Sequence, residues 1–192
     1  MGEDTPEEVL DDAHFKAAFG ENSLAYPILG TIEKVKSFTN EKITQFINEK
    51  YTPSNSVISV CGKFDDKELE GLIEKYFSCW ENNRDYKPDY SSPIIQVNSA
   101  YMKKEIEQLH ISLGLEGLPY GDDNNYELVV LNNIFGAGAS SILFQKVRED
   151  LGLCYSITSY LQPFQGIGTL NIYAGLNKNY AEKALLLHLY PS

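Results

Sequence analysis

The chain of 192 residues has 43% hydrophobic and 12% aromatic side chains, which is enough apolar surface for one sizeable core or two modest ones. A wholly disordered chain is therefore excluded. The formal net charge of −11 argues against nucleic acid as a partner, because phosphate contacts need a basic surface.

The sequence up to about residue 80 predicts helices around one buried strand. Thr5 is the expected N-cap of a helix that begins at Pro6 and ends at about Phe19. Glu8, three residues after Thr5, completes a capping box. The later elements are a short connection at 32–37, a helix after Thr39, a buried strand at 57–61 and a helix from about 65 to 77.

The rest of the sequence predicts a second mixture of strands and helices. Residues 81–93 contain Pro88, Pro93 and several Asn and Ser residues, which is typical of a linker. The elements after it are strands at 99–106 and 108–115, a helix at 125–135, a helix that carries Arg148, strands from 155 and at 169–175, and a helix from 179 to about 187. Both halves thus mix helices with strands in similar orders, which indicates two related modules.

The stretch 144–155 is the most informative part of the sequence, because it places Arg148 and Tyr155 on the two sides of an expected helix-to-strand turn. Gly152 is the residue type that ends a helix in a left-handed conformation. A guanidinium offers permanently charged, planar donors and a phenol adds a neutral one, so the pair can stabilise a developing oxyanion. The alternative is an arginine paired with Glu149 or Asp150 and a tyrosine packed under a sheet.

The glycine-rich stretch at 136–140 does not indicate a nucleotide site. It lacks the Walker lysine, does not match G-x-G-x-x-G, and follows no strand directly. The three cysteines, Cys61, Cys79 and Cys154, form no C-x-x-C pair, and their odd number favours reduced thiols in a cytoplasmic protein. No run of 18 apolar residues predicts a membrane span, so no membrane partner is expected.

Three segments resemble one family in the expected order. Residues 4–7 with 27–31 resemble the later part of the N-terminal domain of the insulinase/pitrilysin-type zinc peptidases, which include bacterial relatives of the mitochondrial processing peptidases. Residues 51–62 resemble the closing strand of that domain, and residues 135–155 resemble the C-terminal homology domain. The resemblance implies an α+β fold of two incomplete homology modules, each with helices packed on a mainly antiparallel sheet.

The implied domain organisation is residues 1–83 as the C-terminal part of the N-terminal peptidase domain, 84–93 as a linker, and 94–192 as the first part of the C-terminal, substrate-clamping domain. The family's zinc motif, His-x-x-Glu-His, is absent, since His14, His110 and His188 are far apart. The third zinc ligand of the family would fall just upstream of Met1. The resemblance therefore implies an internal fragment whose parent protein binds zinc, with no metal bound by this chain.

The resemblance further implies a parent endopeptidase that degrades or processes peptides in a two-domain chamber. Arg148 and Tyr155 would orient the substrate and stabilise the oxyanion, and a loop with Gly136, Gly138 and Ser140 would contact an extended peptide. A helix break without a function is an equally open interpretation of that loop. The chain alone is expected to be inactive.

Two other kinds of protein remain open at this point. One is a non-catalytic partner subunit that completes the site of a zinc-bearing relative, so that a dimer with an identical or related subunit is expected. The other is a structural relative of the kind found in respiratory complexes, which would not need to keep Arg148 and Tyr155. Relatives commonly have an arginine in place of Ile142 and a second basic residue in place of Asp150, so no substrate preference is inferred.

Overall fold

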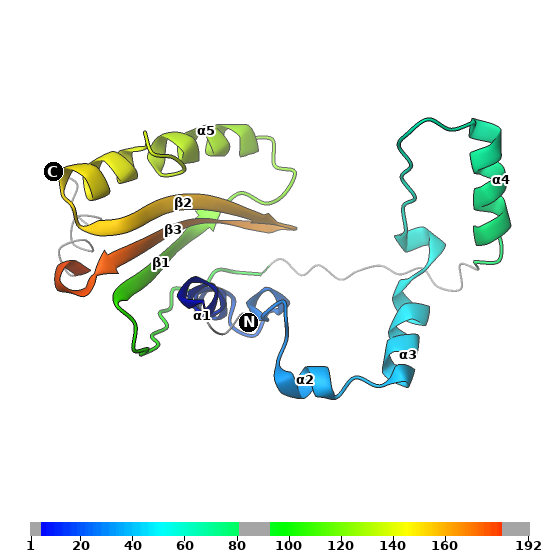
Figure 1. Cartoon of the computed structure of the whole chain (residues 1–192), viewed down its shortest axis with the longest axis horizontal. Coiled ribbons are helices and arrows are strands. Elements are labelled where there is room, and N and C mark those ends of the chain that lie inside the picture. The colour runs from blue at the N-terminus through cyan, green and yellow to red at the C-terminus, as the bar shows by residue number, and fades with distance from the viewer. Residues whose placement is uncertain (1–4, 81–92, 182–192) are drawn as a thin grey trace. The chain divides into compact units, whose positions relative to one another are not determined.

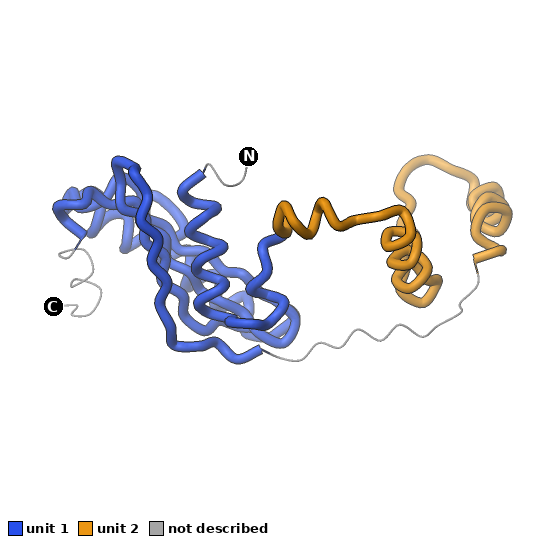
Figure 2. Tube along the Cα trace, turned by 90° about the horizontal axis from the view of Figure 1, so that it is seen from below, with its two compact units in different colours: residues 1–28, 90–192 blue, residues 29–89 orange. Residues whose placement is uncertain are grey.

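The computed structural model describes residues 5–80 and 93–181 of the chain. The chain divides into two compact units, residues 1–28 together with 90–192, and residues 29–89 (Figure 2). We call them unit 1 and unit 2. In these units the first helix belongs with the sheet, whereas the predicted modules place that helix with residues 29–83. The predicted domain bounds, 1–83, 84–93 and 94–192, stay a prediction.

Unit 1 is built on a three-stranded antiparallel sheet (Figure 1). Its strands are β1 (Gln108–Gly117), β2 (Cys154–Phe164) and β3 (Ile167–Asn177), in the order β1-β3-β2. β2 and β3 form a hairpin whose turn contains Gly166 at a φ of 81°, a conformation that favours glycine. The α+β fold with an antiparallel sheet is therefore confirmed.

Helices cover both faces of this sheet. Alternate residues of a strand point to opposite sides, so each strand can contact helices on both faces. On one side lie α5 (Asn125–Phe135) and the π-helical segment η3 (Phe144–Asp150), which pack over the main apolar core. That core contains Leu143, Val147, Leu153, Cys154, Ile157, Ile172, Ala174 and Leu176. On the other side lies α1 (Pro6–Phe19), whose side chains reach the intervening residues of β3, such as Asn171 and Tyr173.

Unit 2 contains three helices among its described residues, α2 (Ile32–Lys36), α3 (Asn40–Lys50) and α4 (Asp66–Phe77). The two longer helices begin where the sequence predicts, and each has a side-chain N-cap. Thr39 Oγ1 accepts a hydrogen bond from the Lys42 backbone N–H at 3.4 Å, and Asp65 Oδ1 accepts from two backbone N–H groups at 3.0 Å. None of the three helices has a buried residue, so their apolar faces are not covered by the described part of unit 2 itself.

Three local predictions are wrong. Residues 57–61 form no strand, since no second strand lies in the described part of unit 2, and Val57 is 93% exposed. Residues 99–106 also form no strand; they are almost wholly exposed, and β1 pairs with β3 instead. Thr5 is the N-cap of α1, but its side chain makes no capping hydrogen bond, so the capping box is not formed.

Other predictions stand with changed details. The connection at 32–37 contains the one-turn helix α2, and the helix that carries Arg148 is π-helical from Phe144 to Asp150. After Asn177 the described residues form only the short 3-10 helix η4 (Lys178–Tyr180), and the remainder of the predicted helix to 187 lies outside the described residues. The predicted linker also lies almost entirely outside them.

Candidate functional site

The turn between η3 and β2 departs from regular backbone geometry at three successive points. η3 is a π-helix, a form that appears frequently at functional sites. Gly152 then has a φ of 61°, as the sequence predicts for a left-handed helix cap, and its N–H donates to the Arg148 carbonyl at 3.1 Å. Finally, the register of β2 against β3 shifts between Cys154 and Ser156.

The register shift is a bulge that includes Tyr155. A bulge adds one residue to a strand and changes the direction of its side chain. Cys154 and Ile157 are buried in the main core, whereas Tyr155 is 57% exposed. The alternative of a tyrosine packed under the sheet is therefore excluded by the structure.

The Arg148 side chain is also accessible and is held only weakly. Its Nε lies 4.0 Å from Glu149 Oε1, and its side chain is 43% exposed. The guanidinium carbon lies 4.6 Å from the centroid of the Phe144 ring, a cation–π contact. An exposed ion pair of this kind contributes roughly 0–1 kcal/mol, so the guanidinium donors remain available to a ligand.

The charge of Arg148 reaches the first residue of β2. Burial raises the pKa of the Cys154 thiol, and the positive charge of Arg148 acts in the opposite direction. Since Cys154 directly precedes Tyr155, the guanidinium and the phenol flank the same turn. The described residues thus present a charged donor and a neutral donor at one exposed end of the sheet.

The three predicted residues of the glycine-rich loop have different surroundings. Gly138 and Ser140 are exposed, and a Cβ added at Gly138 would meet nothing within 4 Å. Gly136 is buried instead, and its carbonyl accepts hydrogen bonds from the Ser159 N–H at 3.0 Å and from Thr158 Oγ1 at 3.2 Å. An added Cβ there would lie 2.8 Å from Leu143 Cδ1, so glycine is needed for this close approach. A role for Gly136, Gly138 and Ser140 in substrate binding stays a prediction.

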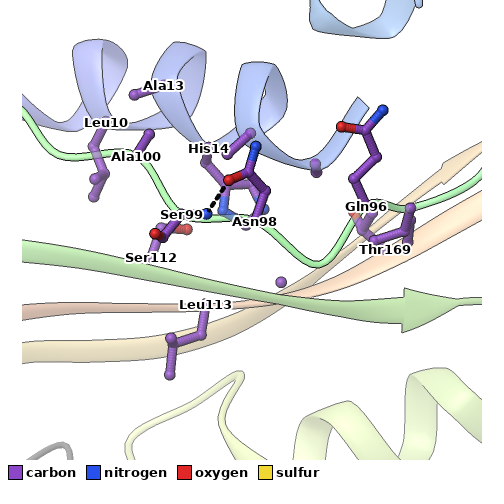
Figure 3. Close-up of a pocket in the computed structure, with 14 residues that line it drawn as sticks. Leu10, Ala13, His14, Gln96, Asn98, Ser99, Ala100, Ser112, Leu113 and Thr169 are labelled. Atoms are coloured by element: carbon purple, nitrogen blue, oxygen red, sulfur yellow. Dashed lines mark hydrogen bonds between the residues drawn. The ribbon is translucent and has the colours of Figure 1, made fainter. Parts of the chain in front are cut away.

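A pocket of about 240 Å³ lies on the opposite face of the sheet, between α1, the extended residues 95–100 and β1 (Figure 3). His14 lines it, and its Nε2 lies 3.1 Å from Asn171 Oδ1. His110 lies elsewhere on this face, with Nδ1 2.9 Å from the Tyr173 hydroxyl and 3.8 Å from Glu7 Oε1. His188 lies outside the described residues.

Sequence analysis missed the polar contacts between α1 and the sheet. Glu7, Asp11 and His14 follow one another at i, i+4 and i+7, which places them on one face of the helix. This spacing was the sequence signal that could have identified a polar face on the helix. The residues that they contact lie more than a hundred positions away, so no local pattern identifies them.

The described residues do not fit a zinc site. Within 5–80 and 93–181, no group of three or more His, Cys, Asp or Glu side chains is placed to hold a metal ion. The helices in the same part of the chain are all too short or too polar to span a bilayer.

Comparisons with known proteins agree with this fold. Residues 37–188 match the family model described as the peptidase M16 inactive domain. The chain is 40% identical over 183 residues to the uncharacterized zinc protease YmxG of Bacillus subtilis, covering 95% of this chain and 44% of that protein. It is 33% identical over 178 residues to an uncharacterized zinc protease of Mycobacterium leprae, covering 91% of this chain and 40% of that protein.

A solved structure shows the same fold. The crystal structure of a peptidase M16 inactive domain from Pseudomonas fluorescens matches with a TM-score of 0.83 at 20% identity, covering 97% of this chain and 45% of that chain. This chain therefore spans less than half the length of each of these proteins. Together with the matches in sequence, this confirms the predicted resemblance: the chain belongs to the peptidase M16 family, the insulinase/pitrilysin-type zinc proteases.

Proposed function

We propose that this chain contributes the substrate-orienting part of a peptide-hydrolysing site, with Arg148 and Tyr155 binding the carbonyl oxygen of the bond that is attacked. The observation that carries the proposal is the irregular backbone from η3 to the start of β2. A π-helix, a left-handed glycine and a bulge succeed one another there, and both side chains are left exposed. Irregular backbone of this kind clusters at functional sites.

The chemistry follows from the two groups. The guanidinium is charged at every relevant pH and presents planar N–H donors, while the phenol donates one further hydrogen bond. As the carbonyl carbon becomes tetrahedral, its oxygen gains negative charge, and both donors bind it more strongly than they bind the substrate. Gly138 and Ser140, in the exposed loop before η3, are the candidates to contact the peptide backbone.

The relatives are named zinc proteases, whereas the described residues of this chain offer no set of zinc ligands. We therefore place any zinc site of the whole protein outside these residues and assign this chain no step that involves the metal. The isolated chain is expected to hydrolyse no peptide. A peptide as the substrate, and the cytoplasm as the location, are parts of this proposal.

The test is Arg148→Ala in the natural full-length protein, with peptide turnover and zinc content both measured. Loss of an oxyanion donor typically lowers kcat by about 10²–10³-fold, and we expect a loss of this order with unchanged zinc content. Arg148→Lys should recover only part of the activity, because an ammonium lacks the planar fork. Lys146→Ala is the matched control, since it removes an exposed positive charge from the same π-helix. Equal turnover in Arg148→Ala and Lys146→Ala would defeat the assigned role.

The second candidate is a non-catalytic subunit that completes the site of a zinc-bearing relative. The description of the matched domain as inactive favours it. The distinguishing experiment assays the full-length protein alone and mixed with a zinc-bearing relative from the same organism. Turnover only in the mixture supports the partner subunit, whereas full turnover by the protein alone excludes it.

A further inference from the structure

One stripe of α1 is hydrogen-bonded to one face of the sheet. The three residues of the stripe are Glu7, Asp11 and His14, each one turn of the helix from the next. Their partners are the Tyr173 hydroxyl, which donates to Glu7 Oε1 at 3.2 Å, the Tyr160 hydroxyl, which donates to Asp11 Oδ1 at 3.0 Å, and Asn171 Oδ1, which lies 3.1 Å from His14 Nε2. We call these six residues the α1 clasp.

The direction of the third contact follows from the hydrogen bonds of Asn171. This side chain is 0% exposed, and its Nδ2 donates to Gln162 Oε1 at 3.1 Å and to Thr169 Oγ1 at 2.9 Å. Only its Oδ1 is left to accept, so His14 Nε2 must carry the proton and donate. The sheet thus offers two donors and one acceptor, and α1 offers the complementary two acceptors and one donor.

The phenols of the α1 clasp remain donors over a wide pH range. Burial, together with the nearby charge of Asp11, raises the pKa of Tyr160 to about 12. Burial also raises the pKa of Tyr173. A protonated phenol facing a carboxylate forms a charge-assisted hydrogen bond, which is stronger than a neutral one.

The C-terminal end of α1 is held by apolar packing instead. Phe19 and Ala18 are buried, and the Phe15 and Phe19 rings meet the Phe164 ring edge to face at centroid distances of 5.9 and 6.1 Å. Apolar contacts are not directional, so they stabilise the helix on the sheet without selecting one register. The α1 clasp does select one, because a shift by one turn would leave the buried Asn171 oxygen and the half-buried Tyr160 hydroxyl without partners.

We propose that Tyr160, Asn171 and Tyr173 are positioning residues that hold α1 on the sheet in one register and one direction. α1 lies outside the matched domain at 37–188, whereas Arg148 and Tyr155 lie inside it. The α1 clasp therefore fixes α1 relative to the sheet that carries the candidate site. The consequence for turnover rests on the proposed function; the docking itself does not.

The first experiment measures hydrogen–deuterium exchange of α1 in the natural full-length protein. Both substitutions remove a hydrogen bond to a carboxylate, so Tyr160→Phe with Tyr173→Phe should speed exchange of the α1 amides by at least roughly tenfold. Tyr126→Phe is the matched control, since Tyr126 is 83% exposed on α5. Equal protection of α1 in the double variant and the control would overturn the proposal.

A conservative variant separates hydrogen bonding from packing. Asp11→Asn keeps an acceptor oxygen for the Tyr160 hydroxyl and should retain most of the protection of α1, whereas Asp11→Leu should lose it. Equal protection in Asp11→Leu and in the unmodified protein would mean that the contact acts through bulk alone, which contradicts the proposal. The α1 clasp also predicts that Tyr160→Phe adds little once Asp11→Leu is present.

The turnover rate distinguishes a positioning role from a purely structural role, because a purely structural role would leave kcat unchanged. The double phenylalanine variant should lower kcat with little change in KM and an unchanged folded fraction. If this variant frees α1 in the exchange experiment but leaves kcat unchanged, the positioning role is wrong. If Arg148→Ala leaves turnover unchanged, the proposed function fails independently, while the exchange result still decides the docking.

Discussion

His14 Nε2 on α1 lies 3.1 Å from Asn171 Oδ1 on β3, although the two residues are 157 positions apart in the sequence. Burial lowers the pKa of His14, while its hydrogen bond to Asn171 and the charge of Asp11 act in the opposite direction. The lowered pKa keeps the imidazole neutral. The neutral imidazole with its proton on Nε2 still donates to the single acceptor that Asn171 offers.

The first prediction concerns stability in acid. The pKa of His14 is lower in the folded protein than its ordinary value of 6.5, so the unfolded chain binds the proton first as the pH falls. The stability that comes from the neutral imidazole is therefore complete above about pH 6.5 and decreases below it, until the folded protein is protonated as well. Urea unfolding of unit 1 at a series of pH values between 8 and 5 would measure this decrease.

The control for this prediction is His14→Gln, whose side-chain amide can donate to Asn171 without titrating. Glu7, Asp11 and His110 lie near the same face and are present in both proteins. The slope of stability against pH should be smaller in the glutamine variant. Identical slopes would show that His14 is not the group whose protonation destabilises the fold.

The second prediction concerns two glycines of the same loop. Gly136→Ala places a Cβ 2.8 Å from Leu143 Cδ1 and against Ser159, so it should destabilise unit 1 by about 1–3 kcal/mol, the usual cost of overpacking. Gly138→Ala places its Cβ in open space, where the φ is not positive, and should leave stability unchanged or raise it by about 0.4–1 kcal/mol. Denaturant unfolding of both variants measures the difference, and equal stabilities would contradict the packing described for Gly136.

The third prediction concerns the reactivity of the three thiols. Cys61 and Cys79 are exposed, whereas Cys154 is buried in the main core. Burial also raises the pKa of Cys154, so less of the reactive thiolate is present. A thiol reagent should therefore label Cys61 and Cys79 quickly, and Cys154 only at the rate at which unit 1 opens.

Mass spectrometry of the labelled protein over time would test this order. Adding denaturant should bring the labelling of Cys154 to the rate of Cys61 and Cys79, because all three thiols are then exposed. Equal labelling of the three thiols without denaturant would contradict the position of Cys154 in the core. Cys154→Ala serves as the control, because the slow labelling phase should be absent from this variant if it belongs to Cys154.

Elements with complete local signals were predicted correctly. Thr39 and Asp65 cap α3 and α4, and apolar residues at helical spacing predict α5. Gly152 was predicted as a left-handed cap and has that conformation. These features depend on neighbouring residues, so the pattern of a short segment contains the information that they need.

Strands were predicted less well, because a strand depends on a partner that can lie anywhere in the chain. Residues 57–61 and 99–106 have the composition of strands, but neither has a neighbour to pair with in the described structure. The strands that did form, such as β2 and β3, are adjacent in the sequence and are joined by a tight turn at Gly166. A local pattern could therefore predict the hairpin but not which segment joins its other edge.

The family, the α+β class and the candidate pair Arg148 and Tyr155 could be read from the sequence, because these depend on residue type and on spacing along a short segment. The folded chain was needed to show that both side chains are exposed, through the π-helix and the bulge beside them. It also decided that His14 donates to Asn171 and that Gly136 packs against β2. Each of these depends on contacts between distant segments, and the free energy of such contacts is set by burial and hydrogen-bond geometry rather than by local propensity.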